Sequence, residues 1–132
     1  MSLTHKVKRA FSSGSEVLEY SETITTGSGF ELDVAIVASS TDIPLAAAID
    51  VSEMKTLFIL ATQDMTLETN DGTTPAATVT LKAGIPVLWT STSGETNPFG
   101  ATNVTGLFVT STLAGTFKMR MGIDPRAGAL PD

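Results

Sequence analysis

Apolar and polar side chains alternate along much of the chain, with the period of two that a half-buried β-strand requires. In the segment 31–36, apolar side chains occupy positions 32, 34 and 36, and acids occupy positions 31 and 33. Segments 64–69, 77–82 and 117–121 alternate in the same way. The segment 57–61 is apolar throughout, which is typical of a central strand covered on both faces. The pattern therefore predicts short strands that bury one face in a shared core.

Turn-forming residues separate these segments at short intervals. The glycine of Asn70-Asp71-Gly72 is expected to take the positive φ of a tight turn. Pro86 cannot donate a ladder hydrogen bond, so the strand around it should begin there or lie at a sheet edge. Ser91–Asn103 is the longest expected loop, and Ser52–Lys55 is the one helical candidate, a single turn. The chain is predicted to be almost entirely strand and turn.

A chain of 132 residues fits one domain with a real core. Ser and Thr make up about a quarter of it, and β-branched Thr favours strands. About eight to ten short strands at regular spacing predict an all-β, single-domain β-sandwich, jelly-roll-like, with an extended N-terminal arm and a C-terminal tail. We assign residues 1–11 to a basic N-terminal arm, 12–124 to the β-sandwich domain and 125–132 to the C-terminal tail.

The net charge of −6 is unevenly distributed. Lys6, Lys8 and Arg9 stand near the start, whereas no Lys or Arg occurs between Phe11 and Glu53. An acidic body repels polyanions, so nucleic-acid binding is not expected. No stretch approaches the roughly 20 apolar residues of a membrane helix, and no apolar region of a secretory signal follows the basic residues. The basic arm is either a contact to an acidic neighbouring subunit or a solvated, charged tail.

Residue types that commonly act in catalysis are scarce in this chain. There is no cysteine, and the single histidine, His5, lies in the basic arm. No Gly-x-Ser-x-Gly turn is present. Asp64 and Glu68 share a strand face, which is more typical of a hydrated surface than of an acid–base pair. Asn70 and Asp71 beside Glu68 could bind calcium, but the EF-hand spacing is absent. No catalytic, cofactor-binding or metal-binding residue is therefore predicted, and no cofactor.

Aromatic residues make up only 6% of the chain, which leaves little for stacking on sugars. Trp89 and Tyr20 are the two large rings with a polar tip. The phenylalanines are expected in the core, with Phe99 as the exception, because it follows Pro98 in the long loop and could anchor a partner. The candidate partner-binding residues are Lys6, Lys8, Arg9, Phe99 and Arg126.

From about Ala48 to Pro125, the strands and turns resemble those of small virion proteins of tailed bacteriophages. The segments that carry the resemblance are 48–52, 55–59, 64–70, 81–89, 105–110 and 117–121. The resemblance lies in the style of strand and turn, without a signature motif. It implies a β-sandwich or jelly-roll accessory subunit that decorates or cements the head, or serves at the neck or tail. No catalytic residue is carried over.

We therefore expect a non-enzymatic virion structural protein that decorates or cements a phage capsid by bridging major capsid subunits. It would be a homo-oligomer, expected to be a trimer, made in the host cytoplasm and located in the virion. A neck or tail component is the alternative within structural proteins. A carbohydrate-binding or host-recognition module is the alternative from another class, and it requires Trp89 or Tyr20 to face solvent.

Overall fold

The structure, a computed structural model, describes residues 3–124, and in this part of the chain it is built from strands and one short turn of 3-10 helix. The strands are β1 (Leu3–Ser13), β2 (Glu16–Thr26), β3 (Ser28–Ile36), β4 (Ser40–Leu45), β5 (Met54–Ala61), β6 (Met65–Thr69), β7 (Thr78–Leu81), β8 (Val87–Thr90), β9 (Leu107–Ser111) and β10 (Gly115–Ile123). The turn η1 (Val51–Glu53) follows Asp50, whose side chain accepts a hydrogen bond from the Ser52 amide. The prediction of an all-β chain with a single helical turn is confirmed.

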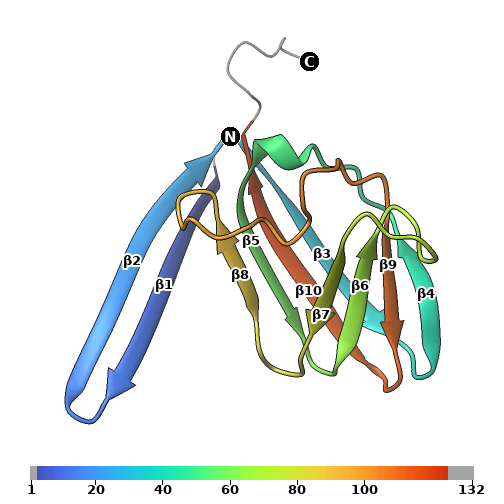
Figure 1. Ribbon diagram of the computed structural model, residues 1–132, viewed down its shortest axis with the longest axis horizontal. Helices are drawn as coiled ribbons and strands as arrows, with labels where there is room; N and C mark the ends of the chain where they lie inside the picture. Colours follow the sequence, from blue (N-terminus) through green and yellow to red (C-terminus); the bar gives the residue numbers. More distant parts are fainter. Residues whose placement is uncertain (1–2, 125–132) are drawn as a thin grey trace.

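Eight of the strands form two four-stranded antiparallel sheets, one ordered β3-β10-β5-β8 and the other β4-β9-β6-β7. The first of the eight strands pairs with the last, the second with the second last, and so on inward to β6 and β7. The eight strands thus behave as one long hairpin rolled into two layers, which is the jelly-roll arrangement. Figure 1 shows the two layers at the centre and right of the molecule.

The core lies between the two layers and is filled by the alternating apolar side chains. Phe117, Met119 and Met121 of β10 are all fully buried, as are Leu57 and Ile59 of β5. The 57–61 segment is a central strand as predicted, and β8, which follows Pro86, lies at the edge of its sheet as predicted. Each strand keeps one face in the core because a one-residue slip in register would turn its apolar side chains to solvent.

One local expectation is corrected. In the turn after β6, the positive φ belongs to Asn70 (72°) and not to Gly72. Asparagine tolerates this conformation because its short polar side chain can hydrogen-bond locally, and its Oδ1 accepts from the Thr105 amide at 2.7 Å. Gly72 instead lies close to the Asp42 carboxyl, where a Cβ atom would be 2.6 Å from the carboxyl carbon.

The N-terminal arm differs most from the expectation. β1 and β2 pair with each other over their whole length and form a two-stranded hairpin, with Leu3 opposite Thr26 and Ser13 opposite Glu16. The boundary placed after residue 11 therefore falls inside β1, and the ribbon extends to Thr26. Figure 1 shows this hairpin standing apart from the two layers. The C-terminal tail assigned to 125–132 lies outside the described residues.

Removing a core ring should weaken the fold far more than removing its exposed neighbour. Phe117→Ala deletes a fully buried ring, so it should lower the free energy of unfolding by about 3–5 kcal/mol. Lys118→Ala, on the solvent face of the same strand, should change it by less than about 0.5 kcal/mol. Urea denaturation followed by the fluorescence of Trp89 measures both. Equal destabilisation by the two variants would contradict this account of the core.

Candidate interaction surface

The hairpin leans on the outer face of the β3-β10-β5-β8 sheet with one of its two faces. Alternation puts Leu3, His5 and Val7 on this face, and Val7 is only 6% exposed. His5 Nδ1 lies 2.6 Å from Thr56 Oγ1, and Thr56 Oγ1 also accepts from the Gly122 amide at 2.7 Å. The base of the hairpin is therefore tied to the two central strands of the sheet.

Two glycines that face each other across β3 and β10 let the hairpin base come this close. Gly29 and Gly122 are partners in the register of the two strands. A Cβ atom on Gly29 would lie 2.2 Å from the Leu3 side chain, and one on Gly122 would lie 2.7 Å from Thr56 Oγ1. Such separations are far below van der Waals contact. The absence of side chains at these positions makes room for the hairpin.

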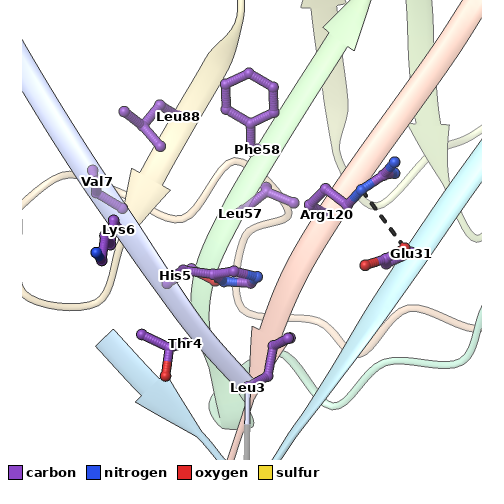
Figure 2. Close-up of a pocket in the computed structure, with 11 residues that line it drawn as sticks. Leu3, Thr4, His5, Lys6, Val7, Glu31, Leu57, Phe58, Leu88 and Arg120 are labelled. Atoms are coloured by element: carbon purple, nitrogen blue, oxygen red, sulfur yellow. Dashed lines mark hydrogen bonds and ion pairs between the residues drawn. The ribbon is translucent and has the colours of Figure 1, made fainter. Parts of the chain in front are cut away.

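A groove of about 350 Å³ runs between the hairpin and the outer sheet face. Its floor includes Phe58 and Leu88, and Arg120 with Glu31 lies on the side away from the hairpin, as Figure 2 shows. Arg120 binds both carboxylate oxygens of Asp33, at 2.9 and 3.1 Å. This pairing lowers the pKa of Asp33 and raises that of Arg120. The groove thus combines an apolar floor with the paired Arg120 on one side and, on the other, Lys6, which is unpaired within the described residues.

Polar contacts hold the hairpin at its middle. Arg9 on β1 forms an ion pair with Glu95 at 2.5 Å. Glu22 on β2 accepts from the Thr92 hydroxyl at 2.6 Å and from the Tyr20 hydroxyl at 3.1 Å. The Thr92 hydroxyl, followed by the Thr90 hydroxyl, lowers the pKa of Glu22. Both contacts reach the end of β8 or the loop after it, so they fix the angle of the hairpin to the body.

Beyond these contacts, the same face of the hairpin continues without any cover from the body. Phe11 lies opposite Leu18 in the ribbon register, and Arg9 lies opposite Tyr20. Phe11 is 66% exposed, although it stands on the same face as the buried Val7. Leu18 and Tyr20 are also more than half exposed. The hairpin tip therefore presents an apolar surface that nothing in the described part of the chain covers.

The predicted partner-binding cations are distributed along this hairpin. Lys8 forms an ion pair with Glu19 at 3.2 Å, and Arg9 is held by Glu95. Lys6 is exposed and has no ion pair among residues 3–124. Arg126 lies outside the described residues. The structure thus brings Lys6, Lys8 and Arg9 onto one strand but neutralises two of them within the chain.

The prediction for Phe99 is wrong. Its side chain is fully buried in the core, so it cannot anchor a partner in this structure. The Asn97 side chain accepts from the Phe99 amide at 2.9 Å, which folds the long loop back over the sandwich. Phe11 is the reverse case, since it was expected in the core and lies exposed on the hairpin tip. The sequence signal that could have found it is the Ser12–Ser15 turn between two apolar positions, Phe11 and Leu18.

Trp89 does not offer a surface for sugar stacking. Its ring is buried, and its Nε1 donates to the Glu95 carbonyl oxygen at 2.9 Å. The part of the carbohydrate-binding alternative that rests on Trp89 is therefore contradicted. Tyr20 is exposed, but it stands on the projecting hairpin beside Phe11 and Leu18. Its hydroxyl is bonded to Glu22, and this hydrogen bond raises the pKa of Tyr20.

The carboxylates considered for catalysis or calcium have structural partners. Asp64 pairs with Lys82 at 3.5 Å and accepts from the Ala83 amide at 2.9 Å. Asn70 uses its side-chain oxygen on Thr105, which leaves it unsuited to a calcium ligand. Within residues 3–124 no group of three or more His, Cys, Asp or Glu side chains is placed to hold a metal ion. None of the helical structure in that range is long and apolar enough to cross a membrane.

Comparison with known proteins gives no match, whether to a family model, to a curated protein sequence or to a solved structure.

The docking of the hairpin should weaken in acid. The pKa of Glu22 is lower in the folded protein, so its carboxylate contributes fully above its ordinary pKa, and the contribution is lost as the pH falls below about 4.5. Val7 lies opposite Glu22 in the ribbon, so its methyl NMR shifts should move over that range. Glu22→Gln removes the titrating group and serves as the control. Identical profiles for the two proteins would contradict the assignment.

Proposed function

We propose that this chain is a non-enzymatic virion structural protein that decorates or cements the capsid of a tailed phage by bridging major capsid subunits. The observation that carries the proposal is the projecting hairpin, a structured element whose apolar face is bare at its tip. An isolated two-stranded ribbon is marginally stable in water, and an exposed apolar face gains free energy when another protein covers it. Such an element suits assembly.

The fold agrees with this role by analogy. Jelly rolls form subunits of viral capsids, although lectins and cupins use the same architecture. The strands and turns from Ala48 to Pro125 also resemble those of small phage virion proteins. The sandwich to which the hairpin is attached is well suited to bear mechanical load, since its strands bury their apolar faces in one continuous core.

The mechanism would be mechanical. The sandwich would remain rigid, and the hairpin would make the contact with a neighbouring subunit. Each contact adds free energy only in the assembled particle, and many identical copies multiply a modest affinity. Because Lys8 and Arg9 are paired within the chain, attachment through the hairpin should depend more on apolar contact than on charge.

Adding the purified protein to capsids that lack it tests this function. Whole-particle reconstruction should show many copies over the head surface. Because hairpin contact is chiefly apolar, occupancy should fall by less than about twofold between roughly 0.1 and 0.5 M salt. Lys6→Glu, which alters the one unpaired cation of the hairpin, provides a matched charge variant, and its effect should disappear at the higher salt.

The location on the particle separates the alternatives. A small ring of copies at the neck or tail would replace decoration by the head–tail connector or tail role. Absence of the chain from every part of the particle would contradict a virion function altogether.

A further inference from the structure

The large exposed apolar side chains in the described part of the chain all lie at one end of the molecule. Four belong to the tip half of the hairpin, and three belong to turns between strands of the sandwich. All seven are between 53% and 70% exposed. The hairpin tip carries Phe11, Val17, Leu18 and Tyr20, and the turns carry Val37, Ile85 and Leu113. Val17 pairs with Ser12 and so lies on the opposite face of the hairpin, which leaves Phe11, Leu18 and Tyr20 as the tip patch.

The turns are gathered at that end by the antiparallel topology. Ser39 in the β3–β4 turn donates its amide to Thr112 in the β9–β10 turn at 2.9 Å. Gly84 in the β7–β8 turn donates to Ala61 at the end of β5 at 2.8 Å. In Figure 1 these turns point to the same side as the β1–β2 turn of the hairpin. Two apolar patches, the hairpin tip and the end turns, therefore face the same direction.

Their combined area is close to what a stable protein–protein contact requires. Large side chains that are half to two-thirds exposed each offer on the order of 100 Å², so the six side chains of the two patches together offer about 600 Å². Specific, stable interfaces begin at about 600 Å² per partner. Either patch by itself offers only about half of this area, so a stable contact has to use both.

The charge at this end of the molecule differs from the charge of the rest of the acidic chain. Beside the patches, Lys8 pairs with Glu19 and Lys82 pairs with Asp64, while Glu16 at the hairpin turn has no ion pair among residues 3–124. The outer face of the other sheet is different, because Asp42 and Asp71 stand near Glu68 there. Desolvation, followed by the neighbouring Asp42, raises the pKa of Glu68. Two copies with a net charge of −6 repel each other least when they meet through the apolar end.

We infer that this end is a self-association surface, in which the hairpin tip of one copy packs on the end turns of another. A second copy is favoured as the occupant because it supplies a patch of matching area, apolar character and low net charge. Each tip covers the turns of the same partner, so the contact is two-fold and uses both patches of each copy. The inference deepens the proposed function by naming the partner of the hairpin, and only its place in the virion rests on that function.

The oligomeric state of the purified full chain tests the inference. At about 100 μM, sedimentation equilibrium should show a dimer for the wild type. Leu18→Glu places a charge in the tip patch and should weaken association at least tenfold. Ser21→Glu adds the same charge to the opposite face of the hairpin, where the side chain is exposed, and should leave association unchanged.

Cysteine cross-linking tests which surfaces meet, because the chain has no cysteine of its own. Under mild oxidation, a mixture of the Leu18→Cys and Ile85→Cys proteins should form the mixed disulfide. A mixture of Ser21→Cys and Ile85→Cys proteins should not, because position 21 lies on the other face of the ribbon. Equal cross-linking in the two mixtures would overturn the pairing of tip and turns.

A wild-type protein that stays monomeric at this concentration would overturn the inference, including a monomer that floats with phosphatidylcholine vesicles through its apolar end. The proposed function fails separately. A monomer that still occupies capsids leaves decoration intact, and a stable oligomer that is absent from every particle contradicts decoration while keeping the self-association.

Discussion

The pairing of β10 with both β3 and β5 is the interaction on which the rest of the structure depends. β10 lies between these strands and buries Phe117, Met119 and Met121 completely. Its partner β3 is more than 80 residues earlier in the chain, as the pairing of Lys118 with Asp33 illustrates. The last strand of the sandwich thus pairs with the first strand of the sandwich, β3. Long-range pairing of this kind carries a large loop-closure entropy, which the buried apolar faces offset.

The same pairing creates the site where the hairpin attaches. β3 and β10 meet at Gly29 and Gly122, and this bare spot admits Leu3 and the Thr56 contact at the hairpin base. Once the base is fixed, Arg9–Glu95 and Glu22–Thr92 set the direction of the ribbon. The strands of the sandwich thus determine where the hairpin attaches, although the hairpin contributes almost nothing to the core. The hairpin tip then extends past the part of the hairpin that contacts the sandwich.

Apolar surface and charge are sorted between regions of the molecule. The hairpin tip and the end turns hold the exposed apolar side chains, beside the ion pairs Lys8–Glu19 and Lys82–Asp64. Acids crowd instead on the outer face of the second sheet, around Asp42 and Glu68. A protein that only had to remain dissolved would gain little from this arrangement. A subunit that must contact neighbours in one orientation gains a preferred contact end and a repelling flank.

The sequence by itself determined the strands of the sandwich, because alternation with a period of two and frequent turn residues are local signals. It also indicated the edge position of the strand after Pro86, since proline lacks the ladder donor. Only the tertiary structure decided whether the rings of Phe11 and Phe99 are buried, because both phenylalanines stand beside loop residues in the sequence. Whether a ring is buried depends on what packs against it. The long loop folds back so that its own Phe99 enters the core, whereas no part of residues 3–124 covers Phe11. The hairpin escaped prediction for the same reason, since a ribbon that is half docked needs few apolar positions and leaves only a faint pattern in the chain.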